Sequence, residues 1–336
     1  MPIVAIDAGG THLRFAVAGD DGALHSYERH PMPGFRSGKS REAIWDAVLD
    51  AIARYVRDVS RKRETGEAIV FSVPGPVVAG SRLLAAPTIL GALGGPIPDL
   101  AGELQARTGR CVRLVNDVSA AAWYLAERID ARRFFVVTVS SGIGGKLFDS
   151  RHADGVLDTG FGGEIGHVVV DTSAGAPLCD CGARGHLGAI SSGRGTEFLA
   201  RRLARSQPGD FASSLVSRRF GAAPGAITNE QHLIPAALAG DAWALSAIEA
   251  AARPLAGVLA ALVAAAGLDR IVVIGGFAHR LGRIYRNVLA STLCALLDSH
   301  AFPLFANGNL TLYDEIEDVC LAGAAAFYRA RCGAVR

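Results

Sequence analysis

The chain lacks the features that mark nucleic-acid-binding, membrane and secreted proteins. Its 34 basic and 32 acidic side chains leave a formal net charge of +2, too small a field to attract nucleic acid or an anionic membrane. The longest uncharged run in the C-terminal half, Pro254–Leu268, is too short and too rich in alanine and glycine to span a bilayer comfortably. No signal peptide is expected, because Met1-Pro2 leads directly into a strand. These absences predict a cytoplasmic protein with no nucleic-acid partner and no membrane.

The composition otherwise fits a soluble globular protein, with half of the residues hydrophobic and a fifth charged. At 336 residues the chain is long for one hydrophobic core, so two domains are expected. Cysteine is scarce, at six residues. Four of these are scattered in apolar contexts and are expected to be reduced core residues: Cys111, Cys294, Cys320 and Cys332.

Short apolar strands alternate with amphipathic helices, a pattern typical of an α/β fold. Strands are predicted at Ile3–Ile6, Leu13–Ala18, Ala68–Val73, Cys111–Val115, Phe134–Val139, Ile271–Ile274 and Leu310–Tyr313. Helices are predicted at Arg41–Lys62, Leu100–Thr108, Gly195–Arg205 and Val319–Arg331. Three segments are less regular: Pro87–Pro98 is predicted to be irregular, Pro208–Asn229 a loose connection, and Ile234–Ala266 a pair of helices interrupted at Pro254.

Two strand–turn–strand segments carry glycine-rich turns suited to phosphate. The first has Asp7 at the end of its strand and Gly9, Gly10 and Thr11 in the turn; the second runs from Ser141 through Gly142, Gly144 and Gly145. Glycines let backbone N–H groups approach a bulky anion that side chains would obstruct, and the Asp7 carboxylate could hold Mg²⁺ through water. The first segment alone reads equally well as an ordinary hairpin. Its repetition favours one phosphate-holding turn per domain.

Polar or glycine residues also follow two buried strands, where α/β folds place their chemistry. Asn116 and Asp117 follow the strand Cys111–Val115, and they act on a ligand, cap the next helix, or do both. Gly275 and Gly276 follow the strand Ile271–Ile274. They either let a nucleotide base or ribose approach the backbone or form a simple strand-to-helix turn.

The stretch from Gly160 to Gly193 gathers the residues with the most specific chemistry. Glu164 and His167 are three apart, so they share a face in a helical turn and point oppositely in an extended chain. A strand-like run, His167–Val170, follows. Two thiols and two imidazoles then form the tetrahedral ligand set expected of structural zinc: His167, Cys179, Cys181 and His186. The alternative is two buried cysteines and two surface histidines.

Taken in order, these segments resemble the ROK family of sugar kinases, bacterial glucokinase-like members of the actin/hexokinase fold. The most specific piece is Glu164-Ile-Gly-His167 followed by Cys179-x-Cys181-Gly-x-x-Gly185, and the resemblance covers nearly the whole chain. It implies an α/β fold, the two-domain actin-like ATPase/hexokinase fold with a cleft between the domains. Residues 1–117 plus 319–336 are predicted to form the small N-terminal α/β domain, and residues 118–318 the large C-terminal α/β domain with the zinc loop.

The resemblance implies an ATP-dependent kinase that phosphorylates the primary, 6-position hydroxyl of a hexose or hexose-like substrate, such as an amino sugar. Mg²⁺ is implied as the catalytic ion, Zn²⁺ as a structural ion, and a homodimer as the assembly. Asp117 matches the catalytic base, and the acceptor contacts match Asn116, Asp117, Glu164 and His167. The phosphate and nucleotide contacts match Asp7, Gly9, Gly10, Thr11, Ser141, Gly142, Gly144, Gly145, Gly275 and Gly276. The zinc ligands match His167, Cys179 and Cys181.

Three positions depart from the family pattern. His186 replaces a third cysteine, and imidazole is a sound zinc ligand. Gly188 replaces a glutamate that holds hydroxyls at the reducing end of the sugar, and Thr88 replaces an asparagine. Losing a carboxylate that accepts hydrogen bonds from two hydroxyls would weaken glucose binding by about 1.5–3 kcal/mol. The pocket is therefore also interpreted as one for an amino sugar, an N-acyl sugar or a cyclitol such as those of antibiotic pathways.

Two other functions compete with that of a kinase. Regulators of this family carry an additional N-terminal DNA-binding domain, for which a phosphate hairpin beginning at Ile3 leaves no room. A non-catalytic sugar-binding protein would have lost catalytic groups, whereas Asp7, Asp117, Glu164 and both glycine turns are present. The kinase is therefore the prediction, with a cyclitol kinase and a sugar-binding protein as its alternatives.

Overall fold

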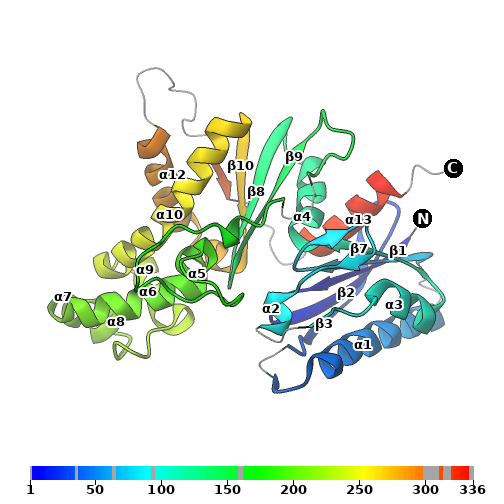
Figure 1. Cartoon of the computed structure of the whole chain (residues 1–336), viewed down its shortest axis with the longest axis horizontal. Coiled ribbons are helices and arrows are strands. Elements are labelled where there is room, and N and C mark those ends of the chain that lie inside the picture. Colours follow the sequence, from blue (N-terminus) through cyan, green and yellow to red (C-terminus); the bar gives the residue numbers. More distant parts are fainter. Residues whose placement is uncertain are drawn as a thin grey trace. The chain divides into compact units, whose positions relative to one another are not determined.

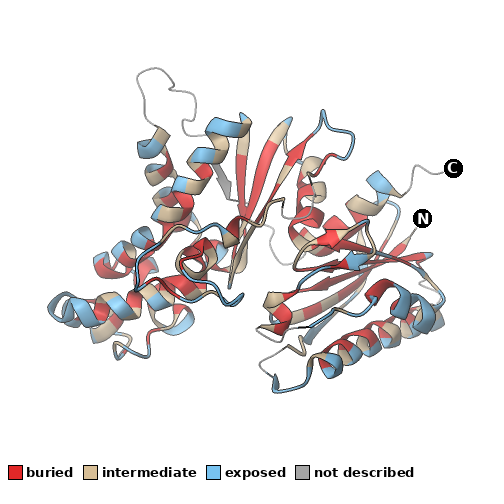
Figure 2. Ribbon diagram, in the orientation of Figure 1, coloured by how far each residue is buried: buried red, intermediate tan, exposed pale blue. Residues whose placement is uncertain are grey.

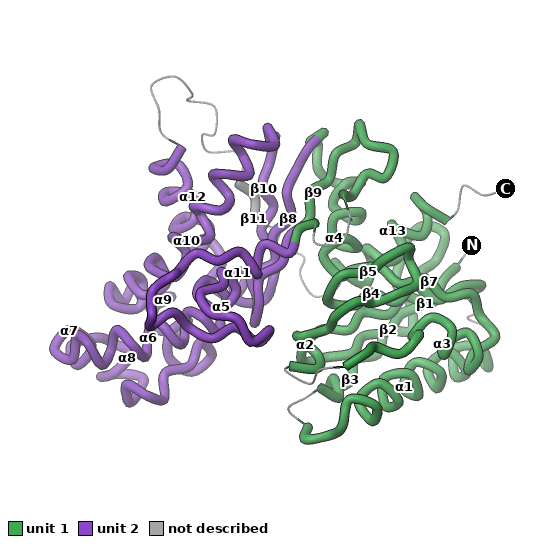
Figure 3. The backbone as a smooth tube through the Cα atoms, in the orientation of Figure 1, with its two compact units in different colours: residues 1–132, 146–163, 317–336 green, residues 133–145, 164–316 purple. Residues whose placement is uncertain are grey.

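The computed structural model describes residues 2–34, 37–62, 66–91, 95–157, 162–297, 310–312 and 319–332 (Figure 1). They form two compact units, which Figure 3 distinguishes by colour. Unit 1 comprises residues 1–132, 146–163 and 317–336, and unit 2 comprises residues 133–145 and 164–316. Each unit is built around a sheet with helices packed on it, as expected of α/β domains.

Unit 1 contains a mixed sheet in the order β3-β2-β1-β4-β7. β1 pairs antiparallel with β2 and parallel with β4, which in turn pairs parallel with β7. The strands are β1 (Ile3–Ala8), β2 (His12–Ala18), β3 (Leu24–Pro31), β4 (Ala68–Val73) and β7 (Cys111–Asn116), and a small ribbon is formed by β5 (Val77–Val78) and β6 (Arg82–Leu83). The helices are α1 (Arg41–Arg61), α2 (Pro87–Leu90), α3 (Leu100–Thr108), α4 (Asp117–Ala126) and α13 (Val319–Arg331).

Side-chain alternation along β1 explains why helices cover both faces of this sheet. Val4 and Ile6 lie in the core shared with α1 and α3, whereas Ile3 and Ala5 lie in the core shared with α4 and α13. Successive strand residues point to opposite faces, so a strand covered on both sides is apolar throughout. β1 and β4 are accordingly buried along their whole length (Figure 2).

Unit 2 contains a sheet in the order β11-β10-β8-β9, in which β10 is parallel to both β8 and β11. The strands are β8 (Arg133–Val139), β9 (Ile143–Asp149), β10 (Arg270–Ile274) and β11 (Leu310–Leu312), and β9 passes into unit 1 from residue 146 onward. The helices are α5 (Leu187–Ser191), α6 (Gly193–Ser206), α7 (Pro208–Ser213), α8 (Leu215–Arg218), α9 (Ile234–Leu238), α10 (Ala242–Ala266), α11 (Gly276–Leu281) and α12 (Arg283–Leu297). A 3₁₀ turn, η2 (Ile165–His167), and a π-helical turn, η3 (Asn229–Leu233), complete the unit.

Helix α10 has the length and composition of a membrane span, yet it packs against α5, α6 and α12 within unit 2. The predicted interruption at Pro254 is wrong, because α10 continues through the proline. Its neighbours Ala251, Ala252, Leu255 and Ala256 are buried, and this packing offsets the hydrogen bond that the proline removes. The helix begins instead after Asp241, whose carboxylate accepts a 2.8 Å hydrogen bond from Ala244 N and caps it.

Four further expectations differ from the structure. The strand-like run His167–Val170 is wrong: His167 ends η2, and Val169, 53% exposed, makes an isolated bridge to His186. The segment predicted to be irregular begins with α2, whose first residue is a proline with the fixed φ favoured there. The loose connection contains α7 and α8. Cys111 is exposed at the start of the edge strand β7, so it is not a core residue.

The other predicted strands and helices are present at nearly the predicted bounds, and Tyr313 lies outside the described residues. The units differ from the predicted domain boundary after Asp117, because α4 packs along α13 and therefore belongs to unit 1. Residues 146–163 belong to unit 1 as well. The predicted boundary lies at the Asn116-Asp117 motif, whereas the limits of the compact units depend on how the helices pack.

Candidate functional site

Unit 1 collects polar residues at one edge of its sheet. β1, β4 and β7 are parallel neighbours, and their register pairs Asp7 with Ser72 and Val73 with Asn116. The carboxyl ends of parallel strands meet at the same edge. Asp7, Ser72, Asn116 and Asp117 are therefore brought to that edge together.

Asp7 is 3% exposed, and both of its carboxylate oxygens are bound. Arg14 Nη1 donates to Oδ2 at 2.7 Å, and Ser72 Oγ donates to Oδ1 at 3.1 Å. Burial by itself would lower the pKa of Arg14, but the adjacent Asp7 carboxylate outweighs it and the pKa is raised. The pair thus holds a charged carboxylate at the end of β1. Arg14 is absent from the residues chosen from sequence, although it stands directly opposite Asp7 in the hairpin register.

The first glycine turn presents its tip to solvent. Gly9 N donates to His12 O at 2.8 Å and closes the turn between β1 and β2, and Gly10 and Thr11 are exposed. Thr11 O accepts from Met32 N at 2.9 Å, which anchors the turn to the segment after β3. An exposed glycine turn with a fixed backbone suits the binding of a phosphate by N–H groups.

Asn116 caps α4, and Asp117 is the first residue of that helix. Asn116 Oδ1 accepts from Val118 N at 3.0 Å and from Ser119 N at 3.1 Å. Asp117 Oδ1 accepts from Val118 N at 2.9 Å. A helix N-terminus favours negative charge, so Asp117 is held as an oriented, half-buried carboxylate. The capping alternative for Asn116 is confirmed, and its contact with a ligand stays a prediction.

Unit 2 places the second glycine turn beside Gly275. β8 and β10 are parallel neighbours, so their carboxyl ends lie at the same edge. Gly275 has φ +104°, and a β carbon there would lie 2.6 Å from the backbone of Val139, so this position needs glycine. Gly145 packs against the ring of Phe135, whereas a β carbon at Gly142 would meet no described atom within 4 Å. Gly145 and Gly275 thus allow close packing, and Gly142 leaves the turn open.

Glu164 precedes η2 and His167 ends it, and the turn packs against backbone on two sides. His167 N donates to Glu164 O at 3.0 Å, so the helical alternative for this pair is confirmed. In a 3₁₀ turn residues i and i+3 eclipse, which directs both side chains from the same face. Between them, Gly166 lies directly against Ile143 of the second glycine turn, and a β carbon at Gly188 would lie 3.2 Å from Gly166 O.

A four-residue cluster of metal-ligand type follows η2. The ligand atoms of His167, Cys179, Cys181 and His186 all lie within 4.8 Å of one another. His186 Nδ1 is 3.3 Å from both Cys181 Sγ and His167 Nδ1. Burial, followed by the neighbouring His167, lowers the pKa of His186 and favours the neutral imidazole that binds metals.

Two thiols and two imidazoles at these separations fit a tetrahedral zinc ion. Gly182 N donates to Cys179 O at 2.9 Å, which closes the tight turn that carries both thiols. Cys181 is exposed and His186 is buried. The alternative of buried cysteines and surface histidines is therefore wrong.

A family model described as the ROK family matches residues 3–330 of the chain. The chain is 38% identical over 344 aligned residues to a C(7)-cyclitol 7-kinase of Streptomyces hygroscopicus subsp. jinggangensis, with 99% of this chain and 95% of the relative covered. It is 34% identical over 291 residues to a 2-epi-5-epi-valiolone 7-kinase of an Actinoplanes species, with 83% and 79% covered. A ROK family glucokinase of Streptomyces griseus, solved with glucose and AMPPNP, matches with a TM-score of 0.77 at 22% identity over 97% of this chain and 98% of that chain. This last likeness confirms the predicted actin-like hexokinase fold.

Proposed function

The chain belongs to the ROK family, and on that premise we propose that it transfers the γ-phosphoryl group of ATP to the exocyclic primary hydroxyl of a seven-carbon cyclitol. That it is a sugar kinase, a phosphotransferase with an alcohol acceptor, follows from the family and its relatives. The acceptor, the donor and the residue roles are the proposal. The hexose 6-hydroxyl stays a prediction, and the relatives that act on position 7 of a C(7)-cyclitol favour the cyclitol alternative.

Gly188 is the observation that carries the choice of acceptor. It lies on α5 against Gly166, the residue between Glu164 and His167, and it stands where the family resemblance implies a glutamate that holds the reducing end of a sugar. A cyclitol has an all-carbon ring and no reducing end, so it needs no such carboxylate. A hexose would lose about 1.5–3 kcal/mol of binding free energy. The cyclitol therefore fits this chain better than glucose does.

Asp117 is assigned as the general base. A hydroxyl is a poor nucleophile, and a carboxylate takes up its proton as the oxygen attacks the γ-phosphorus. The hydrogen bond from Val118 N fixes the direction of the Asp117 carboxylate, and the N-terminus of α4 stabilises its charge. Asn116, Glu164 and His167 are assigned to acceptor hydroxyls, which they would orient toward this base.

The donor phosphates are assigned to the two glycine turns. Backbone N–H groups of Gly9–Thr11 and Ser141–Gly145 would stabilise the negative charge that develops during transfer. Mg²⁺ supplies further charge neutralisation at the phosphates when it is bound with ATP, and Asp7 is the carboxylate assigned to it. Gly275 and Gly276, where the backbone turns from β10 into α11, are assigned to the nucleoside.

Zinc is assigned to His167, Cys179, Cys181 and His186 as a structural ion. These residues would fix the loop that ends at α5 and hold His167 in one orientation. The reaction itself would depend on Asp117 and the phosphate turns. A homodimer and a cytoplasmic location, where ATP is supplied, complete the proposal.

ADP release from the zinc-loaded enzyme with Mg-ATP tests the acceptor. The panel contains C(7)-cyclitols, glucose, mannose and N-acetylmannosamine, and ³¹P NMR of the product identifies the phosphorylated hydroxyl. A kcat/KM for a cyclitol about tenfold or more above that for every hexose is expected, a difference of about 1.4 kcal/mol. Equal efficiency with glucose would overturn the cyclitol assignment. No turnover across the panel would favour a sugar-binding protein without catalysis.

A further inference from the structure

One arginine of unit 2 contacts both the second glycine turn and the loop from His167 to His186, called the metal loop because it carries the four residues of metal-ligand type. Arg194, in the first turn of α6, donates from Nε to Ser141 O at 2.6 Å, and its Nη1 lies 2.6 Å from Asp180 Oδ2. Asp180 stands between Cys179 and Cys181, and Ser141 opens the turn assigned to the donor phosphates. We propose that Arg194 is a positioning residue through which the metal loop controls the affinity for ATP. The inference rests on the proposed function.

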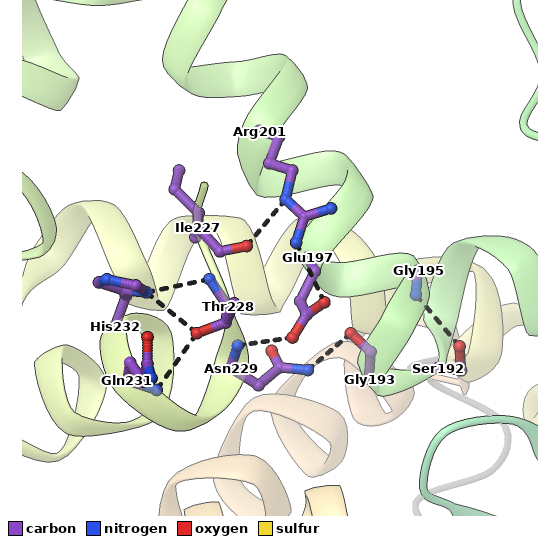
Figure 4. A network of polar contacts seen from close by, with 10 residues as sticks. All are labelled: Ser192, Gly193, Gly195, Glu197, Arg201, Ile227, Thr228, Asn229, Gln231 and His232. Atoms are coloured by element: carbon purple, nitrogen blue, oxygen red, sulfur yellow. Dashed lines mark hydrogen bonds and ion pairs between the residues drawn. The ribbon is translucent and has the colours of Figure 1, made fainter. Parts of the chain in front are cut away.

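The helix end of this connection is fixed in a buried network (Figure 4). Ser192 Oγ accepts from Gly195 N at 3.1 Å and caps α6, and Asn229 Nδ2 donates to Gly193 O at 2.8 Å. Ser192 is 1% and Asn229 is 7% exposed. Gly193 N also donates to Ser140 O at 2.8 Å. The backbone that carries Arg194 is therefore held against the end of β8.

The Asp180 end of the connection depends on the metal loop. Asp180 is 41% exposed and sits in the turn that both thiols share. A metal bound to Cys179 and Cys181 constrains this turn and therefore the Asp180 carboxylate, whereas free thiols impose no such constraint. The planar guanidinium binds a carboxylate and a carbonyl in one fixed orientation. A displaced Asp180 would consequently release the Arg194 side chain and loosen Ser141.

A second connection between the same parts runs along the backbone. His186 is followed directly by α5, which ends at Ser191, and α6 begins at Gly193. If this backbone carried the influence of the metal, Arg194 would be dispensable. The two connections therefore predict different behaviour for a variant that lacks the arginine.

The Kd for AMPPNP, measured by calorimetric titration without acceptor, distinguishes the side-chain connection from the backbone connection. Removing zinc from the wild-type enzyme is expected to raise Kd about fivefold. Zinc-loaded Arg194→Gln and Asp180→Asn are each expected to start at that weaker Kd and to change less than about twofold when zinc is removed. The Kd of Arg194→Lys should lie between those of these variants and the wild type, because lysine keeps the positive charge but cannot donate to Asp180 and Ser141 from one planar group. Arg202→Gln, which removes the same charge from an exposed position of α6, should behave like the wild type.

Two other measurements separate positioning from damage to the fold. The zinc content of Arg194→Gln should equal that of the wild type by atomic absorption, and its KM for ATP should rise with Kd while the acceptor KM stays constant. Asp180→Asn leaves the arginine itself unchanged and tests the link if Arg194→Gln folds poorly, and the double variant should bind AMPPNP no more weakly than either single variant. A wild-type Kd and a wild-type zinc response in Arg194→Gln would overturn the inference. A wild-type enzyme that binds no AMPPNP would instead overturn the proposed donor, and the inference with it.

Discussion

The side-chain nitrogen of Asn116 donates a 2.9 Å hydrogen bond to the carbonyl oxygen of Gly75. Since Asn116 Oδ1 also caps α4, this one side chain joins the end of β7, the start of α4 and the turn after β4. Gly75 has φ +119°, a conformation that favours glycine. The contact fixes the backbone that carries Asp117, so Asn116 orients the proposed base whether or not it also touches the acceptor.

Asp117→Asn tests that base. The amide keeps the size of the carboxylate but cannot accept the proton of the attacking hydroxyl, so kcat should fall by about 10²–10⁴. Binding of the acceptor and of AMPPNP should stay within about twofold of the wild type, because general-base catalysis acts on the transition state. ADP release and calorimetry measure the two effects. Asp130→Asn, at an exposed position of unit 1, is the matched control, and near-normal turnover in Asp117→Asn would remove Asp117 from the mechanism.

Gly188→Glu tests the determinant of the acceptor. Restoring the carboxylate should lower the glucose KM by about 10- to 150-fold, the equivalent of about 1.5–3 kcal/mol of binding free energy. The gain is limited by space, because the new β carbon would stand 3.2 Å from Gly166 O and the neighbour must shift slightly. Steady-state kinetics with glucose and a cyclitol provide the measurement. Gly188→Ala adds the same β carbon without the carboxylate, and an equal gain in that variant would contradict the explanation.

Cys181→Ser tests the zinc site. A closed set of four donors should hold about one zinc ion per chain in the wild type, and the variant should retain a small fraction of it. Because metal binding free energy contributes to folding, Tm should also fall by about 5–10 °C. Atomic absorption and thermal unfolding measure the two effects. Cys111→Ser, exposed on β7, controls for loss of a thiol, and full zinc in Cys181→Ser would argue against the ligand assignment.

Tyr285→Phe tests an unpaired buried hydroxyl. Tyr285 is 1% exposed, no described residue pairs with its hydroxyl, and burial raises its pKa. The folded state therefore keeps the neutral form: its contribution to stability is complete below about pH 10, the ordinary tyrosine value, and is lost as the pH rises above it. Phenylalanine should remove that alkaline loss and raise the free energy of unfolding at neutral pH by about 1 kcal/mol.

Urea unfolding near pH 7 and near pH 10.5 measures the effect of this substitution. The Tyr285 ring packs edge-to-face on Phe277 with 5.8 Å between the ring centroids, and this contact should persist in Tyr285→Phe because it does not need the hydroxyl. Tyr27→Phe, at a position 42% exposed on β3, is the control. Identical alkaline destabilisation of Tyr285→Phe and the wild type would show that the hydroxyl is not the source.

The strands and the cluster of two thiols and two imidazoles could be predicted because their signals are local. β1 and β4 are apolar along their whole length, and the four residues of the cluster lie within one short glycine-rich segment. The run His167–Val170 is also rich in β-branched residues, but β propensity depends on a neighbouring strand, and these residues are not paired into one. Pro254 fails as a local signal for the opposite reason, since burial on both sides of it maintains α10.

The ion pairs could not be predicted from local patterns, because they depend on which segments of the chain come together in the fold. Arg14 meets Asp7 through the register of a hairpin, which alternation along two strands could have identified. Arg194 meets Asp180 and Ser141 only in the folded chain, since Ser141 lies 53 positions away from it in the sequence. The spacing of these residues along the chain does not predict that contact.

Helix α13 has a consequence for biosynthesis. Its Leu321, Ala324 and Ala325 complete the core that Ile3 and Ala5 begin, so the first strand and the last helix of the described chain cover one another. About 300 residues separate them, and a ribosome adding 5–20 residues per second needs roughly 15–60 s to synthesise that length. During this interval that face of the nascent sheet lacks α13 and, of the described helices, has only α4 to cover it. Nascent unit 1 should therefore bind chaperones until α13 leaves the exit tunnel.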